Sequence, residues 1–542
     1  MRLLVRAGKM PETTLSAEVS EGFRPWGIFG NNVGNFLFSE SLIRALHTPD
    51  TEIVPDSFGM ENAKNIGWWA SSINNGFDAV VLPMANAFRS DWMGKLNCMT
   101  ALIRKLKVPV VVVGIGAQQP LDADTGHIGA NPRLDAIVKG FVSAVLEKSA
   151  RIGVRGEITA SYLEALGFGS EHVEAIGCPS MYVQGGVLNI DKRPLDSEGP
   201  IAFNTARSAR GAGDFIKHVS EEFPNSDFVC QTIEELRLLL WGDPIRGVKD
   251  PNIIATTQHQ LYKEGRVRFF LDPSTWISFM KERQFSIGTR MHGGFAAILA
   301  GTPAFIGCFD SRTLELSRFH AVPHQRIASL ADLPPVADVY ESADFGPTVA
   351  AQRDNFSAYL RFLEENGLQH VWMPGMADPS YEELLSRVVY PTAVEPLGAN
   401  MDALVSRIAY LREGGPDSQA RASEYYVAPF AEPLPETTSA PSKTAQAAGD
   451  SSPSVSRVPN SGDTAKPQLQ DKGDSPRELG QLPLVDQLAA LLKSKPFEAV
   501  LKLANGAQHS LDRQTELLEE LLGLLASSHN DGRYTENVTG QQ

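Results

Sequence analysis

The sequence has few cysteines and no long apolar run. Its 542 residues include four cysteines, Cys98, Cys178, Cys230 and Cys308, and no two of them form a Cys-x-x-Cys pair. Such spacing favours structural thiols in a reducing compartment over a disulfide framework. No apolar run approaches the roughly 20 residues that span a bilayer, and residues 1–21 contain no apolar signal core. We therefore expect a cytoplasmic protein.

An excess of basic residues is also lacking. Lysine and arginine number 49 against 64 aspartates and glutamates, a net charge of −15, which argues against binding along a nucleic-acid backbone. A local cationic pocket is compatible with this sum. The sequence contains no Walker-type phosphate loop, no His-Glu-x-x-His or other clustered metal-ligand spacing, and no Gly-x-Ser-x-Gly nucleophile elbow. We accordingly expect no metal site and no bound cofactor.

Short apolar strands alternate with amphipathic helices in a first stretch of the chain. The predicted strands are 26–30, 52–55, 78–83, 108–114, 151–154 and 173–177, and the predicted helices include 35–47, 134–148 and 157–166. The third and fourth strands are continuous runs of valine, isoleucine and leucine, which is typical of parallel strands buried on both faces. Repeated strand–helix units predict a parallel α/β sheet.

A second stretch repeats this pattern after a polar break at 191–199. Its predicted strands are 201–204, 227–231, 267–271, 285–288 and 304–308, and its predicted helices are 274–283, 294–300 and 312–319. Residues 349–412 read mostly as helix and either close the second half or cross back onto the first. The predicted domains are therefore an N-terminal Rossmann-like α/β domain at 24–190, a second Rossmann-like domain at 198–335 and a helical closing segment at 336–413.

The composition changes after residue 413. Residues 431–480 contain seven prolines and no aromatic residue, so this stretch buries too little apolar surface to offset its ordering entropy. We predict a disordered linker at 414–482. Amphipathic periodicity returns at 483–528, which predicts a small helical module. That module either binds a protein partner or is an appendage without activity.

The most informative segment joins the predicted strand 285–288 to a helix beginning near Gly293. The turn between them contains Arg290 and His292. In a parallel sheet this turn lies at the carboxyl edge, where open α/β sheets bind ligands, and a helix N-terminus favours an anion. Arginine binds phosphate or carboxylate through two parallel hydrogen bonds, and histidine exchanges protons near neutral pH. The structural alternative is that Arg290 pairs with a neighbouring carboxylate and His292 caps the helix.

Other loops at carboxyl edges carry further polar residues. The loop after strand 304–308 begins Asp310-Ser311-Arg312, and strand 201–204 ends at Asn204. Three more loops, 30–36, 114–118 and 151–157, are predicted to line the same cleft. The first supplies Asn32 and Asn35, and the third supplies Arg155, which either reaches the cleft or pairs with Glu157 as ordinary structure.

At these residues the sequence resembles the polysaccharide pyruvyl transferase family. The resemblance covers roughly residues 24–325 and rests on the glycine/asparagine turn at 30–35, on the stretch 153–167 around Arg155, and on Gly288-Thr-Arg-Met-His-Gly293 followed by Ala-Ala-x-x-Ala-Gly-Thr-Pro. The last feature resembles the family's Arg-Leu-His-Gly motif. The chain differs from the family pattern at Asn35, where an aspartate is frequent, and at Cys178, where Gly-Asp-Pro is frequent.

The resemblance implies a fold like that of a two-domain GT-B glycosyltransferase, in agreement with the two α/β halves. It implies transfer of pyruvate from phosphoenolpyruvate to sugar hydroxyls as a ketal during polysaccharide synthesis. On it, Arg290 and His292 match the donor-binding and catalytic positions, and Arg155 matches the other family arginine. The acceptor is then a saccharide, free or lipid-linked, and a lipid-linked acceptor places the enzyme at the inner membrane face.

The chemistry of such a transfer requires cations for two anionic groups, an acid and a base. We assign Arg290, Arg155 and the helix N-terminus at Gly293 to the anions, His292 to proton transfer and Asp310 to the base. The remaining predicted substrate-binding residues are Asn32, Asn35, Asn204, Ser311 and Arg312. Two other classes stay open: a nucleotide-sugar-dependent GT-B glycosyltransferase, and a catalytically decayed scaffold whose tail helices bind a partner.

Overall fold

A computed structural model describes residues 1–23, 26–118, 131–400 and, individually, 403, 404, 407, 410 and 430. All of them belong to one compact unit, Met1–Glu432. The predicted linker at 414–482, apart from Phe430, and the predicted helical module at 483–528 lie outside the described residues. Among the helices of the described residues, none has the length and apolar character needed to cross a membrane.

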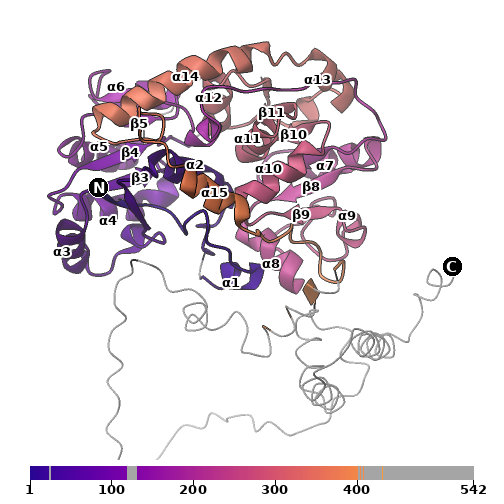
Figure 1. Cartoon of the computed structure of the whole chain (residues 1–542). Coiled ribbons are helices and arrows are strands. Elements are labelled where there is room, and N and C mark those ends of the chain that lie inside the picture. The colour runs from indigo at the N-terminus through magenta and orange to yellow at the C-terminus, as the bar shows by residue number, and fades with distance from the viewer. Residues whose placement is uncertain are drawn as a thin grey trace, which may run out of the picture. The chain divides into compact units, whose positions relative to one another are not determined.

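The first half of the unit contains a parallel sheet flanked by helices (Figure 1). Its elements are β1 (Arg2–Val5), α1 (Ala17–Gly22), α2 (Gly34–Leu46), β2 (Glu52–Pro55), η1 (Met60–Asn62), α3 (Ile66–Gly76), β3 (Ala79–Pro83), η2 (Ser90–Trp92), α4 (Met93–Ile103), β4 (Val110–Val113), α5 (Pro132–Leu146), β5 (Ile152–Val154), α6 (Glu157–Ala165), β6 (Val173–Ala175) and η3 (Pro179–Tyr182). The strand order is β2-β1-β3-β4, and β5 pairs with β6 beside it. A parallel bridge between Ile115 and Val154 connects the two groups of strands.

The predicted strand at 26–30 is wrong, and β1 takes its place in the sheet. Residues 26–30 form a turn in which Gly27 and Gly30 have positive φ angles of 66° and 59°. The strand β1 is short and lies between Arg2 and Arg6, so its apolar stretch of three residues gave little signal. It is a strand because it pairs in parallel with β2 on one side and with β3 on the other.

The second half contains a larger parallel sheet. Its elements are β7 (Ala202–Asn204), α7 (Ala212–Glu222), β8 (Asp227–Cys230), α8 (Ile233–Trp241), α9 (Gln260–Lys263), β9 (Val267–Phe269), α10 (Pro273–Lys281), β10 (Ser286–Gly288), α11 (Met291–Leu299), β11 (Ala304–Cys308), α12 (Ser311–Phe319), β12 (His324–Arg326), η4 (Leu330–Asp332) and α13 (Val336–Ser342). Its order is β12-β11-β10-β7-β8-β9. The five predicted strands of this half are confirmed to within two residues, and β12 is an addition to them.

In each sheet, among the described residues, successive strands are first added on one side of the first strand and then on its other side. The place where the side changes determines where a ligand can bind. In the second sheet β7 lies between β8 and β10, and in the first sheet β1 lies between β2 and β3. Helices that follow two such neighbouring strands leave in opposite directions and open a crevice at the carboxyl edge. The order of the second sheet is that of a dinucleotide-binding Rossmann fold. The predicted fold class, two Rossmann-like α/β halves in a GT-B-like arrangement, is confirmed.

Backbone hydrogen bonds join the two halves next to these crevices. The Val33 N–H donates to the Gln231 carbonyl at 3.0 Å, and the Ile233 N–H donates to the Asn31 carbonyl at 3.1 Å. Asn32 and Thr232 form an antiparallel bridge between them. The glycine/asparagine turn of the first half is therefore attached directly to the β8–α8 connection of the second half.

The chain returns to the first half after it completes the second. Helix α14 (Gly346–Glu365) lies beside β5 and α6 (Figure 1), and Arg361 forms a 2.9 Å ion pair with Glu174 of β6. Helix α15 (Pro379–Arg387) contacts α2, where Glu382 pairs with Arg44 at 2.7 Å. Both predicted alternatives for residues 349–412 are observed in part: α14 and α15 cross back onto the first half, whereas Val394 pairs with Phe269 of β9 and Arg407 donates to the Leu239 carbonyl in the second half.

A buried ion pair reinforces the junction and yields a stability prediction. The Lys9 ammonium lies 2.7 Å from Asp272, and both side chains are at most 4% exposed. We expect Lys9→Met to lower the free energy of unfolding by about 3–5 kcal/mol, because it leaves a buried carboxylate uncompensated. The measurement is urea denaturation.

Two further variants complete this test. The double variant Lys9→Met/Asp272→Leu is expected to recover most of the loss, since it removes both buried charges. Arg2→Met, which breaks an exposed pair with Glu52, is expected to cost about 0–1 kcal/mol. If Lys9→Met costs no more than Arg2→Met, the pair does not hold the halves together.

Candidate functional site

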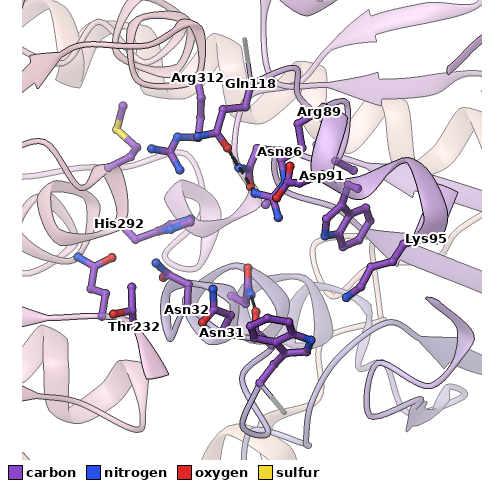
Figure 2. A pocket seen from close by; sticks show the side chains of 18 of the residues that line it. Asn31, Asn32, Asn86, Arg89, Asp91, Lys95, Gln118, Thr232, His292 and Arg312 are labelled. Atoms are coloured by element: carbon purple, nitrogen blue, oxygen red, sulfur yellow. Dashed lines mark hydrogen bonds and ion pairs between the residues drawn. The ribbon is translucent and has the colours of Figure 1, made fainter. Parts of the chain in front are cut away.

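A pocket of about 330 Å³ opens between the carboxyl edges of the two sheets (Figure 2). This volume suits a small ligand. Its walls from the first half are Arg6, Trp26, Gly30, Asn31, Asn32, Asn35, Glu61, Ala85, Asn86, Ala87, Arg89, Asp91, Trp92, Lys95, Gln118 and Arg155. Its walls from the second half are Gln231, Thr232, Arg290, Met291, His292 and Arg312. The pocket therefore lies at the place in each sheet where the strand order changes side.

The pocket is positively charged although the chain as a whole is acidic. Its lining contains five arginines and a lysine, against two carboxylates, Glu61 and Asp91. Cations gathered in a concave surface with low-dielectric walls raise the local concentration of anions. The lining therefore favours an anionic ligand although the net charge of the chain is negative.

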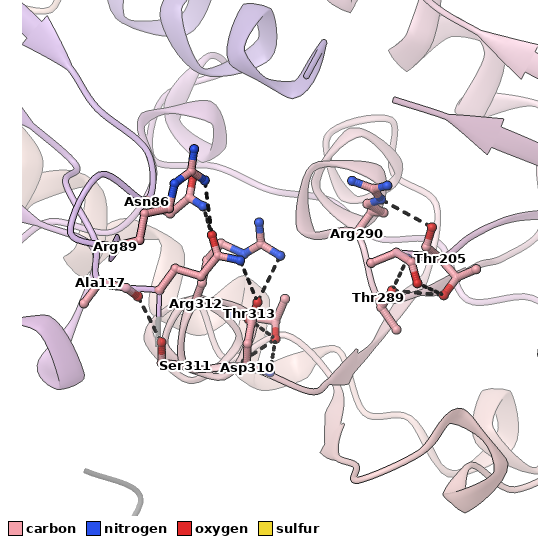
Figure 3. Close-up of polar contacts among 12 residues, drawn as sticks. Asn86, Arg89, Ala117, Thr205, Thr289, Arg290, Asp310, Ser311, Arg312 and Thr313 are labelled. Atoms are coloured by element: carbon pink, nitrogen blue, oxygen red, sulfur yellow. Dashed lines mark hydrogen bonds and ion pairs between the residues drawn. The ribbon is translucent and has the colours of Figure 1, made fainter. Parts of the chain in front are cut away.

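The β10–α11 connection positions Arg290. Arg290 is the residue before α11, and its N–H donates to the Asn204 side-chain oxygen at 2.8 Å. Its Nε donates to the Thr205 carbonyl at 3.3 Å (Figure 3), and Nη2 lies 3.7 Å from Glu235. Burial lowers the pKa of Arg290, and Glu235 opposes this effect. The guanidinium is thus fixed at the edge of the pocket by groups from β7 and α8.

Two further predicted residues, Asn204 and Gly293, hold the β10–α11 connection in place. Asn204 is buried behind the pocket lining and holds the backbone of Arg290. Gly293 lies against it: a Cβ at Gly293 would meet the Asn204 amide nitrogen at 2.4 Å. The helix begins two residues earlier than predicted, at Met291. His292 therefore lies in the first helical turn, not in the loop before it.

His292 extends from α11 into the pocket (Figure 2) and is held on two sides. Its Nε2 lies 3.8 Å from the Cys178 sulfur. A Cβ at Gly34 would be 2.3 Å from its Nδ1, so only glycine fits at that position. Burial lowers the pKa of His292 to about 3, and the positive charges of Arg155 and Arg312 act in the same direction. The imidazole is therefore neutral at physiological pH.

Arg155 is a buried cation with an unused donor. The side chain is 1% exposed and lines the pocket, and its Nε donates to the Gly114 carbonyl at 3.0 Å. Its Nη2 is buried without a hydrogen-bond partner. Burial lowers the pKa of this guanidinium, with Cys178 acting in the opposite direction. Of the two predicted alternatives, Arg155 faces the pocket, and an anion there would satisfy the unused donor.

In the loop Asp310-Ser311-Arg312, one residue lines the pocket and the other two make structural hydrogen bonds. Asp310 caps α12 by accepting hydrogen bonds from the Thr313 N–H and hydroxyl, both at 2.9 Å. Its other oxygen lies 3.2 Å from Arg312 and 3.3 Å from the Gln118 amide (Figure 3). Ser311 donates to the Ala117 carbonyl at 3.0 Å. Among the three, Arg312 lines the pocket, whereas Asp310 and Ser311 lie behind it.

The glycine/asparagine turn contributes three amides to the pocket. Asn32 accepts a hydrogen bond from the Gly34 N–H at 2.8 Å, which shapes the start of α2. Asn35 donates to the Phe29 carbonyl at 2.9 Å, so its amide is used to hold the turn. Asn31 has a positive φ of 78°, and its side-chain oxygen is buried without a hydrogen-bond partner.

Sequence reasoning missed a second group of cations around Trp92. Arg6, Arg89 and Lys95 lie 5.4, 5.8 and 5.0 Å from the Trp92 ring, and Glu61 pairs with both Arg6 and Lys95 at 2.5 Å. Burial raises the pKa of Glu61, but Arg6 and Lys95 together hold it below its usual value. These residues carry no motif: Arg6 follows β1, Glu61 lies in η1, Arg89 precedes η2, and Lys95 lies in α4.

Among the residues that the structure describes, no group of three or more His, Cys, Asp or Glu side chains has the spacing of a metal site. The four cysteines are free thiols. Cys178 is buried, and its N–H donates to His320 Nε2 at 3.0 Å. The side chains that face the pocket therefore offer anion binding, hydroxyl binding and proton exchange as their own chemistry.

Comparison with known proteins identifies a family. The family model described as polysaccharide pyruvyl transferase matches residues 32–306, half of the chain. This range includes Asn35, Arg155, Arg290 and His292. No match to a curated protein was found.

Solved structures give distant similarities. The Staphylococcus aureus MnaA structure with UDP is 12% identical, with a TM-score of 0.32, covering 72% of this chain and 99% of that one. The Methanocaldococcus jannaschii UDP-GlcNAc 2-epimerase is 10% identical, with a TM-score of 0.37, covering 67% and 99%. Anabaena Alr3699/HepE with UDP and glucose is 12% identical, with a TM-score of 0.34, covering 71% and 99%. At these values the similarities do not establish a shared ligand.

The electrostatics of His292 are directly testable. Removing a neighbouring positive charge favours the imidazolium, so we expect Arg312→Gln to raise the pKa of His292 from its value of about 3. The measurement is an NMR titration of the imidazole signals, assigned with a His292→Gln variant. Arg318→Gln, on the exposed side of the same helix, is the matched control and should leave the titration unchanged. An equal pKa in wild type and Arg312→Gln would contradict this account.

Proposed function

The chain belongs to the polysaccharide pyruvyl transferase family, and from that membership we propose that it transfers pyruvate from phosphoenolpyruvate to two hydroxyls of a saccharide, forming a ketal. The observation that carries the proposal is the unused donor of buried Arg155 beside a neutral His292 in a cationic pocket. The proposal places the reaction in the cytoplasm, on a free saccharide or a lipid-linked one at the inner membrane face. Phosphoenolpyruvate acts as co-substrate.

Phosphoenolpyruvate carries a phosphate and a carboxylate, and the pocket offers matching cations. Arg155 binds one anionic group through its free Nη2. Arg290 and Arg312 bind from the second half, and the N-terminus of α11 adds its partial positive charge. A planar guanidinium engages two oxygens at once, which fixes the orientation of the donor. Held in this way, the donor lies next to His292.

His292 is proposed to deliver the proton that starts the reaction. Bound phosphoenolpyruvate offsets the charges of Arg155 and Arg312, so the imidazole can take up a proton that it does not hold in the empty pocket. It passes this proton to the methylene carbon, and an oxocarbenium-like centre forms at C2. One hydroxyl attacks C2, the phosphate leaves, and a second hydroxyl closes the ketal. One of the two hydroxyl protons leaves with the phosphate, and the other restores His292.

The position of Asp310 changes its proposed part in this scheme. Its carboxylate is engaged by Thr313, Arg312 and Gln118. We propose that Asp310 orients Arg312 toward the donor, and that it does not itself touch the acceptor hydroxyl. A positioning residue of this kind affects donor affinity through the arginine it holds.

Donor binding provides a first prediction. Phosphoenolpyruvate at about 100 times its dissociation constant should stabilise the protein by roughly 2.7 kcal/mol. We expect Arg155→Met to fold, because it replaces a buried cation by an apolar side chain of similar length, and to lose this stabilisation. Thermal unfolding with and without phosphoenolpyruvate measures both effects. Arg318→Met is the control, and an undiminished shift in Arg155→Met would contradict the assignment.

The proton on His292 provides a second prediction. Because the ligand raises the pKa of His292 from about 3, binding takes up a proton, and affinity falls as pH rises toward the pKa of the complex. Isothermal titration calorimetry in two buffers of different ionisation enthalpy measures this uptake. His292→Gln should still bind the donor, but without the part of the proton uptake that belongs to His292. Its turnover should fall by far more than tenfold. Turnover within about tenfold of wild type, roughly 1.4 kcal/mol in barrier, would exclude His292 as the proton donor.

A further inference from the structure

We propose that the turn at residues 26–31 is the acceptor subsite, where a sugar ring lies on the Trp26 indole and a sugar hydroxyl donates to the Asn31 side-chain oxygen. This inference rests on the proposed function, because it concerns the second substrate of the same pocket. It assigns a chemical class, a neutral polyhydroxyl ring, to one wall of that pocket. The donor subsite occupies the wall formed by Arg155, Arg290 and Arg312.

Trp26 is unusual in being both exposed and part of the pocket. Its side chain is 47% exposed, and it lines the pocket in the company of amides and charged groups. A large apolar ring left exposed in a polar pocket marks a contact surface for a ligand. An indole offers a flat apolar face together with a polar N–H, which matches the C–H face and the hydroxyl rim of a sugar ring.

Asn31 identifies the polarity of that ligand. Its side-chain oxygen is buried in the pocket wall without a hydrogen-bond partner. A carbonyl oxygen accepts hydrogen bonds, so its missing partner is a donor. Fully ionised phosphoenolpyruvate has no O–H or N–H group and cannot supply one. A ligand that satisfies Asn31 must carry an O–H or N–H group, as the hydroxyls of a saccharide do.

Gln231 adds a complementary unused group on the adjoining segment. Its Nε2 is buried without a partner and lines the pocket, and its backbone carbonyl accepts the Val33 N–H. The backbone pairing between 31–33 and 231–233 places this donor next to the Asn31 turn. A hydroxyl both donates and accepts. One acceptor and one donor, each unused, therefore match a polyhydroxyl ligand better than an anion.

The turn is rigid and adjoins the reacting centre. The Asn31 N–H donates to the Trp26 carbonyl at 2.6 Å, and the Gly30 N–H donates to the Gly27 carbonyl at 3.1 Å. The same segment continues to Gly34, which lies against His292. Figure 2 shows Asn31 and Asn32 on the wall below His292. A sugar held on this turn can therefore present its hydroxyls to a donor bound beside His292.

The experiment compares paired substitutions that separate side-chain chemistry from backbone conformation. Asn31→Gly tolerates the positive φ of this position but removes the acceptor oxygen, whereas Asn31→Asp keeps an acceptor there. Trp26→Ala removes the ring, whereas Trp26→Phe keeps an aromatic face. Trp372→Ala, which removes an exposed tryptophan outside the pocket lining, is the matched control.

The probes are the methyl glycosides of glucose, galactose and mannose, titrated by NMR into the full chain in the presence of phosphoenolpyruvate. We expect at least one glycoside to bind, and its affinity to fall at least tenfold in Trp26→Ala and in Asn31→Gly. Trp26→Phe, Asn31→Asp and Trp372→Ala should remain within about threefold of wild type. The thermal shift with phosphoenolpyruvate should persist in Trp26→Ala.

Two outcomes would overturn the inference. One is equal glycoside affinity in wild type, Trp26→Ala and Asn31→Gly. The other is a wild-type protein that binds phosphoenolpyruvate but none of the three glycosides. Failure of the proposed function gives a different result, namely no thermal shift with phosphoenolpyruvate while a glycoside still binds in a Trp26-dependent manner.

Discussion

The site depends on the backbone pairing between residues 31–33 and 231–233. Through it the turn of the first half and the β8–α8 connection of the second become one surface. The pairing brings Gly34 against His292, which approach so closely that no side chain fits between them. Neither half alone contains a complete pocket, because Arg155 comes from one half and Arg290 from the other. The chemistry is therefore a property of the junction.

The second constraint is the burial of positive charge. Arg155 and Arg290 are kept at the pocket with few opposing carboxylates, and their pKa values fall as a result. Burial, reinforced by the charges of Arg155 and Arg312, keeps His292 neutral. A site of this kind has its donors and charges in place before an anion arrives, so little reorganisation accompanies binding. Under the proposed function, the anion that enters then raises the pKa of His292 beside it.

Much of this was accessible from the sequence, and what was not has a physical cause. Strands such as β4 and β11 are continuous apolar runs, and the β10–α11 turn with Arg290 and His292 was recognisable from its residues. The strand β1 was missed because its identity comes from its neighbours β2 and β3, which are distant in sequence. The cations around Trp92 were missed for the same reason. The position of Asp310 behind the pocket follows from its capping of α12, a role that spacing alone does not distinguish from catalysis.

The return of α14 and α15 to the first half limits where the chain can be truncated. A fragment ending at residue 335 would lack Arg361, one of the two partners of Glu174 on β6, and Glu382, the partner of Arg44 on α2. The first half is thus completed by helices that are synthesised after all the strands of the second half. On the ribosome, α15 therefore reaches the first half only after Arg387 has been synthesised, by which point every strand of the second sheet has already been made.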